Sequence, residues 1–410
     1  MPSLEMSTRI DWRKFEPTRT RLYIAIAIWA AIVIPTTAVM YWMVLTGRSD
    51  VVIGGDFLAF YAAAKASLSG AATEIYNAAY FQNQLEALAP HRDDIKLTWQ
   101  YPPTYLLFVS AFGFAPYLLS YTLWATASAI SFFAVLRNLI NDRLILLAAF
   151  ACPSAYMAYI TGQNGFLSAA LITIAVVYPK SRPIFAGIAA GLLTYKPQLG
   201  LLIPLAYLAG GCWRAFISAA LTAIGLAAIS LAAFGIETWA AFFDSILNTS
   251  ALVTSKAFPL AKMATPYTAA LFAGLPVVVA KLIYVLFSGV SVFVVWRTWR
   301  SDLAPLWKAS ALLSVVFFTA PYGFHYELII LALPVAYIAH QAVENSWLKY
   351  EKLMMAIAVM LPFGFAHLAD MRQGPSIIFI TVLLIFVMTM RRINVAAPGI
   401  FEFKKKLQSV

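Results

Sequence analysis

Long apolar runs alternate along this chain with short polar gaps, and several of the runs are near 20 residues long. Runs of that length with few charges are typical of helices that cross a lipid bilayer. The pattern predicts spanning helices at roughly residues 22–46, 117–136, 144–160, 165–179, 183–195, 197–210, 215–234, 276–296, 303–320, 326–342, 353–369 and 375–390. We therefore expect an all-α polytopic membrane protein with about 12 transmembrane helices.

Four shorter apolar stretches are not predicted to span. Pro102-Pro103 interrupts the chain before residues 102–115, which we interpret as a re-entrant or surface helix. Residues 263–274 predict a second short outer helix, because the flanking gaps must stay on their assigned sides of the membrane. Residues 56–69 and 76–88 predict two amphipathic helices that lie on the membrane surface.

The charges lie mainly in the gaps and predict the orientation of the chain. Only 11% of residues are charged and 62% are hydrophobic, with a net charge of +11. Such a composition excludes an ordinary soluble domain, and the excess of cations indicates topology and not nucleic-acid binding. The basic tails at residues 1–21 and 391–410 predict cytoplasmic ends, which leaves residues 22–390 as a single membrane domain with its first outer loop at 47–101.

This orientation places the unusual polar groups of the chain on the outer side. They are Asp56, Trp99-Gln100-Tyr101-Pro102-Pro103, Thr161-Gly162-Gln163-Asn164, Tyr195-Lys196-Pro197-Gln198, Tyr322-Gly323-Phe324-His325-Tyr326-Glu327 and Asp370-Met371-Arg372. Irregular backbone at membrane depth is tolerated only where it is buried or lines a cavity. We therefore expect a polar cavity, open to the outer leaflet, that these groups line.

Asp56 is the leading candidate in this set. An acid at membrane depth is costly and is therefore a functional candidate by default. Alternatively, its carboxylate caps the helix that begins at Phe57, since Asp is a preferred residue at helix starts and suits the positive end of the helix dipole.

The other candidates also have structural alternatives. A lone cation before Pro197 suits a phosphate, but Lys196 alternatively extends from a helix end towards water. Gln163-Asn164 alternatively forms only a turn between two spans, and His325 is alternatively a hydrogen-bonded interfacial histidine. Arg372 alternatively pairs with Asp370 in a surface loop. Cys152 and Cys212 offer neither a disulfide framework nor a metal-ligand spacing.

Several short motifs occur together and in order. They are Gly-Asp-Phe-x-x-Phe-Tyr-x-Ala-Ala at 55–64, Leu-x-Gly at 68–70, Tyr76, Tyr-Pro-Pro at 101–103, Gly-Gln-x-Gly at 162–165 and Lys-Pro-Gln at 196–198. In this combination the chain resembles glycosyltransferase family 87, whose characterised members are polyprenyl-phosphate-mannose-dependent α-mannosyltransferases with the multi-span C-type glycosyltransferase fold. The resemblance extends from about residue 50 to 340.

The resemblance implies an inverting, metal-independent transfer of a sugar, without a cofactor, from a polyprenyl-phosphate donor to a lipid or glycan acceptor. Membrane lipids would be further partners, and nucleic acid would not. The implied location is the inner (plasma) membrane of a bacterium, with the active site facing the exterior. The family's catalytic aspartate maps onto Asp56 and its late outer-face histidine onto His325. We expect the remaining site residues to bind the donor phosphate or the substrates: Lys196, Arg372, Gln163, Asn164, Tyr101, Tyr61 and Gln198.

The chemistry explains why these residue types would be needed. A polyprenyl-phosphate sugar is already activated, so the protein must supply a base for the acceptor hydroxyl and cations or N–H groups for the departing phosphate. Two other classes compete with this interpretation. A lipid or glycan transporter or flippase would also have many spans and a polar cavity, although repeat symmetry would be expected in it. A non-catalytic membrane scaffold would leave the clustering of outer polar groups without a reason.

Overall fold

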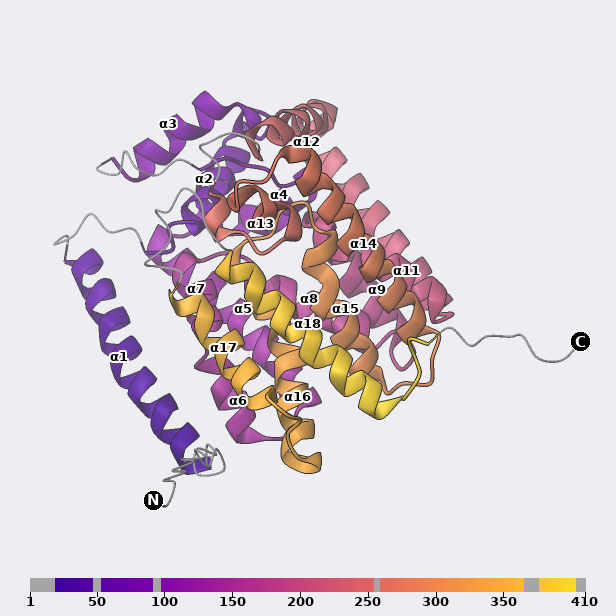
Figure 1. Cartoon of the computed structure of the whole chain (residues 1–410). Coiled ribbons are helices and arrows are strands. Elements are labelled where there is room, and N and C mark those ends of the chain that lie inside the picture. The colour runs from indigo at the N-terminus through magenta and orange to yellow at the C-terminus, as the bar shows by residue number, and fades with distance from the viewer. Residues whose placement is uncertain (1–18, 47–52, 91–96, 254–258, 365–375, 403–410) are drawn as a thin grey trace, which may run out of the picture.

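The computed structural model describes residues 19–46, 53–90, 97–253, 259–364 and 376–402. In these ranges the regular elements are all helices, apart from one isolated antiparallel bridge between Met263 and Phe324. Figure 1 shows the helices packed side by side, with α1 along one flank of the body. The all-helical class predicted from the apolar runs is confirmed for the described residues.

The first half of the chain contains two long helices, α1 and α5, and many short ones. Its elements are α1 (Arg19–Leu45), α2 (Phe57–Leu68), η2 (Glu74–Tyr76), α3 (Ala78–Leu88), α4 (Pro103–Val109), η3 (Ser110–Phe114), α5 (Tyr117–Leu139), α6 (Arg143–Phe150), α7 (Pro153–Thr161), α8 (Gly165–Val177), α9 (Pro183–Leu192), η4 (Leu193–Tyr195), α10 (Pro197–Gly200) and α11 (Leu202–Ala209).

The second half is built mainly from longer helices. Its elements are α12 (Trp213–Val253), η5 (Leu260–Lys262), α13 (Pro266–Phe272), α14 (Val277–Trp299), α15 (Pro305–Thr319), η6 (His325–Leu331), α16 (Ala332–Asn345), α17 (Glu351–Gly364) and α18 (Ile377–Ala396). α12 contains a break at Gly235, whose φ of 81° is not helical, directly after the predicted end of the span 215–234.

Six helical stretches in the described part are long and apolar enough to cross a membrane. They are Leu22–Leu45, Tyr117–Leu139, Trp213–Leu247, Val277–Trp299, His325–Asn345 and Ile377–Ala396. The predicted span 144–160 is instead a pair of helices, α6 and α7, bent by 48°. Other predicted spans, such as those at 165–179 and 303–320, correspond to helices of 10–17 residues. The structure thus supports a membrane protein with six such spans, or seven if the bent pair crosses once.

The helix after Asp56 does not lie on a surface, as residues 56–69 had predicted. Nine of the 12 residues of α2 are buried, and their side chains are almost all apolar. A helix that is apolar on every face is typical of a protein interior, so the amphipathic interpretation was wrong here. α3 does have the predicted amphipathic character: Phe81 and Leu85 are buried on one side, and Glu86 is exposed on another.

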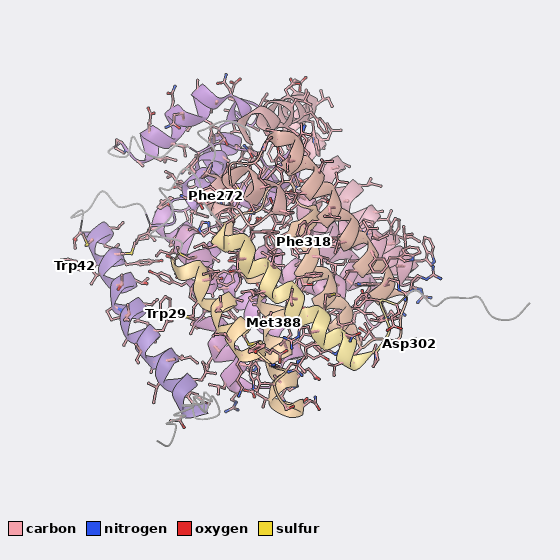
Figure 2. All side chains as sticks on the ribbon, viewed as in Figure 1. Trp29, Trp42, Phe272, Asp302, Phe318 and Met388 are labelled. Carbon is pink, nitrogen blue, oxygen red and sulfur yellow. The ribbon has the colours of Figure 1, made fainter. Side chains whose placement is uncertain are left out.

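The helix that follows Asp56 and several other short helices gather at one end of the molecule. Figure 1 shows α2, α3, α4 and α13 together at this end, while the connection between α16 and α17 lies at the other. Between the two ends the body is filled with apolar side chains, including the fully buried Phe318 and Met388 (Figure 2). Trp29 on α1 contacts the ring of Tyr156 at a centroid distance of 6.1 Å.

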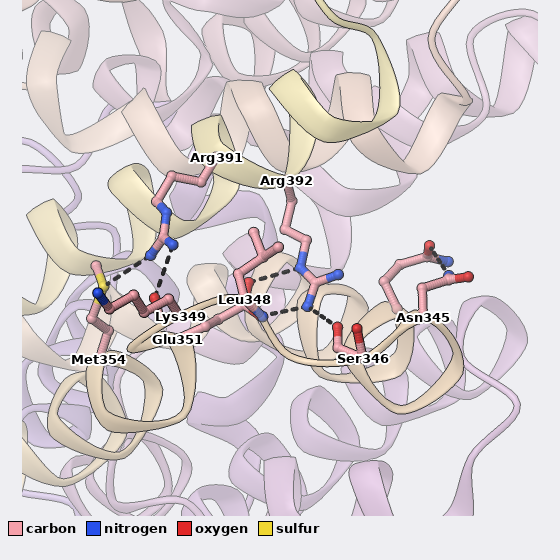
Figure 3. A network of polar contacts seen from close by, with 9 residues as sticks. Asn345, Ser346, Leu348, Lys349, Glu351, Met354, Arg391 and Arg392 are labelled. Carbon is pink, nitrogen blue, oxygen red and sulfur yellow. Dashed lines mark hydrogen bonds and ion pairs between the residues drawn. The ribbon is translucent and has the colours of Figure 1, made fainter.

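A buried ion pair fixes the far end of the body, where α17 begins and α18 ends (Figure 3). Arg392 donates from Nε to Oε1 of Glu351 over 2.7 Å, and from Nη2 to the carbonyl of Ser346 over 2.8 Å. A second guanidinium bond reaches the other carboxylate oxygen, which also accepts from the Leu348 N–H. α18 continues to Ala396, beyond Met390, the predicted end of the last span. Arg392 therefore belongs to the helix and is buried, whereas the sequence had predicted it in the basic tail.

We expect Glu351→Ala to lower the stability of the protein strongly. The change leaves the buried guanidinium of Arg392 without its carboxylate, and breaking one partner of a buried pair typically costs about 3–5 kcal/mol. Glu344→Ala is the matched control, since Glu344 is half exposed and contacts His340 over 3.3 Å on the surface of the same region. The measurement is the apparent melting temperature in detergent. Equal melting temperatures for the two variants would contradict the structural importance of the buried pair.

Candidate active site

Asp56 is the last residue before α2, and main-chain hydrogen bonds attach it to the end of α7. The Gly54 N–H donates to the Ile160 carbonyl over 3.2 Å, and the Asp56 N–H donates to the Thr161 carbonyl over 3.1 Å. From α5, the Tyr117 hydroxyl donates to the carbonyls of Ile53 and Gly54 over 2.7 and 2.8 Å. Because these bonds involve main-chain atoms, the position of Asp56 does not depend on its own side chain.

The carboxylate of Asp56 does not cap the helix that follows it. α2 has no side-chain hydrogen bond from its N-cap residue. The Gln163 side chain forms a hydrogen bond with the carboxylate instead. Gln163 is in turn oriented by Tyr101, whose hydroxyl donates to the amide Oε1 over 3.3 Å. The capping alternative is therefore wrong for the side chain, and Gln163 is part of the immediate surroundings of Asp56.

The turn that carries Gln163 can approach α2 because it begins with a glycine. Gly162 has a φ of 70°, and a Cβ at this position would lie 2.7 Å from the Cβ of Phe57 and 2.9 Å from Cε2 of Tyr121. The Trp124 indole N–H holds the same turn by donating to the Gly162 carbonyl over 3.0 Å. Any larger residue would push the turn, and Gln163 with it, away from Asp56.

Burial raises the pKa of Asp56 from its ordinary value of 3.8 to about 6. Desolvation is the dominant cause, since it disfavours the charged form of a carboxyl group. The positive charge of Lys262, the hydrogen bond from Gln163 and the positive charge of Lys196 oppose it, in that order. The result is a carboxylate that is ionised at neutral pH and still able to accept a proton, as a general base requires.

Aromatic rings surround this part of the molecule. The Tyr101 and Tyr105 rings lie 4.6 Å apart between centroids, and Tyr105 stacks on Tyr195 at 4.7 Å. Phe60 of α2 contacts Tyr101 edge to face at 5.5 Å, and Trp99 lies 5.2 Å from the same ring. Tyr101 is partly exposed whereas Tyr105 is fully buried. Aromatic faces of this kind suit the apolar face of a sugar ring or a lipid chain.

Lys196 is buried and paired with Glu327, a partner that the sequence had not indicated. Its Nζ lies 2.6 Å from Oε1 of Glu327, and the side chains are 5% and 2% exposed. Oε2 of Glu327 accepts from the Phe324 N–H over 2.9 Å. The Lys196 ammonium also lies 5.3 Å from the centroid of the Tyr326 ring. Lys196 therefore does not extend into water, and its charge is balanced inside the protein.

A second main-chain junction brings His325 to the site. Ala264 donates to the Gly323 carbonyl over 2.7 Å, next to the bridge between Met263 and Phe324. Two segments some 60 residues apart in the chain, 260–264 and 322–325, thus run together. The His325 side chain forms a hydrogen bond with the main chain of Lys262. The structure therefore places Lys262, which sequence reasoning missed, beside His325, and its positive charge acts on Asp56.

The remaining predicted residues have different surroundings. Asn164 is fully buried and donates from Nδ2 to the Tyr105 hydroxyl over 3.1 Å. Tyr61 is buried, and its hydroxyl donates to the Ala115 carbonyl over 2.9 Å, so it joins α2 to the start of α5. Gln198 is half-buried, and its side chain makes no hydrogen bond with another residue of the described ranges. Arg372 and its predicted partner Asp370 lie outside the described residues.

The described residues contain no group of three or more His, Cys, Asp or Glu side chains that could hold a metal ion. The groups that act on Asp56 are instead one amide and two lysines, with several tyrosines in the same region, and His325 lies beside one of these lysines, Lys262. This set can accept a proton, bind an anion and stack on a ring, which are the requirements set out above for transfer of an activated sugar.

Comparison with known proteins gives one match. The sequence model of glycosyltransferase family 87 matches residues 99–321, which is just over half of the chain. No curated protein and no solved structure matches the chain significantly. The matched range includes Gln163, Lys196 and Lys262, whereas Asp56 precedes it and His325 follows it.

We expect Lys196→Met to destabilise the protein, because it leaves the Glu327 carboxylate buried without its cation. The loss for one partner of such a pair is typically about 3–5 kcal/mol, and the double variant Lys196→Met, Glu327→Gln should recover much of it. The measurement is thermal unfolding in detergent of both variants and the wild type. Unchanged stability of the single variant, or no recovery in the double variant, would contradict the pairing as the main role of Lys196.

Proposed function

Because the chain belongs to glycosyltransferase family 87 and is therefore a glycosyltransferase, we propose that it transfers a hexose from a polyprenyl-phosphate sugar to a lipid or glycan acceptor. The proposal includes inversion at the anomeric carbon and Asp56 as the general base. The observation that carries it is the buried Asp56 carboxylate: desolvation raises its pKa to about 6, while the charges of Lys262 and Lys196 and the side chain of Gln163, itself held by Tyr101, favour its ionised form. The family match removes the transporter and scaffold alternatives as the primary function.

The reaction step that we propose is a single displacement. Asp56 takes the proton of an acceptor hydroxyl while that oxygen attacks the anomeric carbon of the donor from the side opposite the phosphate. The bond between the anomeric carbon and the phosphate oxygen breaks, and its electron pair leaves with polyprenyl phosphate. One negative charge thus disappears from Asp56 and one appears on the phosphate, so the reaction is balanced without a further reactant.

The surroundings of Asp56 support its role as a base and not merely as a structural acid. Its main chain is fixed by α7 and α5, so the carboxylate is not needed to hold α2 in place. A carboxylate can accept more than one hydrogen bond, so the interaction with Gln163 does not prevent it from accepting one from an acceptor hydroxyl. Tyr101, which orients Gln163, is also the most accessible ring of the aromatic group and is the candidate for stacking on the sugar.

The proposed site faces the outside of the cell membrane in our interpretation. Arg297 at the end of α14 donates to the Ile400 carbonyl over 2.9 Å, and Arg391 donates to the Lys349 carbonyl over 2.8 Å. The carboxyl-terminal ends of α14 and α18, which carry these basic groups, lie away from α2, α4 and α13 (Figure 1). Since Lys and Arg are enriched on the cytoplasmic side, this arrangement supports an inner-membrane protein with Asp56 on the exterior side.

We expect Asp56→Asn to abolish most of the activity and leave the protein folded. Loss of a general base typically lowers turnover about 10²–10⁴-fold, while the main chain that holds residue 56 is unchanged. The assay follows labelled hexose from synthetic polyprenyl-phosphate hexoses to a membrane lipid extract, with purified protein and melting temperature measured in parallel. Glu74→Gln, a change at an exposed acid of the same region, is the control and should keep wild-type activity.

Near wild-type transfer by a folded Asp56→Asn protein would remove Asp56 from the chemistry. The donor is tested separately in the wild-type protein. If no polyprenyl-phosphate hexose yields product and a nucleotide sugar does, the proposed donor class is wrong even though the family assignment stands.

The activity should depend on pH through Asp56. The base works only when ionised, so the turnover number is expected to be constant above pH 6 and to fall about tenfold per unit below it. A raised carboxyl pKa means that the folded protein binds this proton more tightly than the unfolded chain. The contribution of Asp56 to stability is therefore most favourable below its ordinary pKa and is lost as the pH rises through 6. Asp56→Asn should accordingly be at least as stable as the wild type at pH 7.5, and a clearly lower melting temperature there would contradict the assigned burial.

A further inference from the structure

Among the described residues, Lys262 is a cation that acts on Asp56 and has no carboxylate partner. It ends η5, and the bridge between Met263 and Phe324 together with the Ala264–Gly323 hydrogen bond fixes the chain immediately after it. The Ser376 hydroxyl at the start of α18 supports the same segment by donating to the Met263 carbonyl over 3.3 Å. The backbone position of Lys262 is therefore defined by two other parts of the fold.

The two lysines near Asp56 differ in their partners. Lys196 is 4% exposed and forms its ion pair with Glu327 at 2.6 Å. Lys262 is half-buried and, within the described ranges, forms no ion pair with a carboxylate. It nevertheless exerts the larger effect of the two on Asp56, and its charge also acts on His325. Its half-buried ammonium group therefore acts on the reacting acid and has no carboxylate partner among the described residues, so it can pair with an anion from outside the protein.

We propose that Lys262, and not Lys196, contacts the phosphate of the sugar donor and of the polyprenyl phosphate that leaves. The inference rests on the proposed function, which supplies the phosphate. Lys196 is assigned to holding Glu327, whose carboxylate accepts a hydrogen bond from the Phe324 N–H and thereby supports the segment that carries His325. His325, beside Lys262, completes the group that faces the phosphate.

The changes of charge in the reaction explain why a cation at this position would be effective. In the donor the phosphate is a diester with one negative charge, and after transfer it is a monoester that gains a second. Over the same step Asp56 loses its charge to the acceptor proton. Lys262, near both groups, would first keep Asp56 ionised and then interact more strongly with the phosphate as the negative charge moves there. An interaction that strengthens in the transition state accelerates the reaction and does not merely tighten binding.

The test compares Lys262→Met and Lys262→Arg with Lys281→Met, a control in which an exposed lysine of α14 is changed. Removing one group that stabilises developing charge typically costs about 10²–10³-fold in turnover, so Lys262→Met should lose this much, and Lys262→Arg should retain more activity because it keeps the charge. The control should match the wild type. A loss confined to melting temperature, with normal turnover in the folded fraction, would overturn the proposal.

The pH profile gives a readout that a structural lysine would not change. Without the positive charge, the Asp56 carboxyl is harder to ionise, so the acidic limb of the profile should move to higher pH in Lys262→Met. The other charged or titratable groups that act on Asp56 or lie beside those that do are unchanged in this variant: Lys196, Glu327, His325, Tyr101, Tyr117 and Tyr326. An acidic limb at the wild-type pH would contradict the proximity of Lys262 to the base.

A binding experiment separates this inference from the proposed function. The affinity of farnesyl phosphate, as a short lipid phosphate, and of inorganic phosphate is measured for the wild type and for Lys262→Met without any transfer. Weaker binding of farnesyl phosphate by the variant supports the assignment, and weaker binding of inorganic phosphate as well would show a site for phosphate alone. Equal binding of farnesyl phosphate by both proteins would overturn the inference. Absence of transfer by the wild type would instead overturn the proposed donor.

Discussion

A charged side chain inside this apolar helical body is stable only if the fold supplies an opposite charge or several hydrogen bonds. Two pairs meet the requirement fully. Arg392 and Glu351 join α18 to α17 at one end, and Lys196 and Glu327 join the break before α10 to η6 near the other. Asp56 meets it only in part, since it has the Gln163 amide and the charges of two lysines that do not form an ion pair with it. The partial compensation leaves its pKa near 6, and a fully paired carboxylate could not take up a proton at neutral pH.

The fold holds this weakly compensated acid in place with main-chain bonds from neighbouring elements. The junction of Gly54 and Asp56 with α7 positions the base, and the junction of segment 263–264 with 323–324 positions Lys262 and His325. Neither junction uses the side chains that we assign to chemistry. The unfavourable free energy of a partly unpaired, buried Asp56 is therefore offset by the packing of α2, α5 and α7, whose interior residues are almost entirely apolar.

Local features of the sequence predicted part of this arrangement. An acid before an apolar helix, and a Gly-Gln turn between two apolar runs, indicated Asp56 and Gln163, and the structure brings these two side chains together. The sequence did not indicate Glu327 as the partner of Lys196, because 131 residues separate them and no local pattern records such a contact. Lys262 was missed for the same reason: its importance comes from the bridge between Met263 and Phe324, and in sequence it resembles an ordinary basic residue at the edge of an apolar run. The prediction of about 12 spans is not confirmed: six stretches of the described residues are long and apolar enough to cross a membrane, and several other predicted spans correspond to apolar helices of 10–17 residues.

The contrast between Lys196 and Lys262 shows how burial decides which cation is available. Position before a proline in an apolar region made Lys196 the more conspicuous of the two in the sequence. A lysine inside the protein needs a partner of opposite charge, and for Lys196 this partner is Glu327. The resulting ion pair is nearly neutral, so a further anion would interact with it only weakly. Lys262, at the end of a short helix and still partly accessible, keeps its charge without a carboxylate among the described residues. A phosphate approaching Asp56 would therefore gain more from the half-buried cation than from the fully buried one, although both act on the same carboxylate.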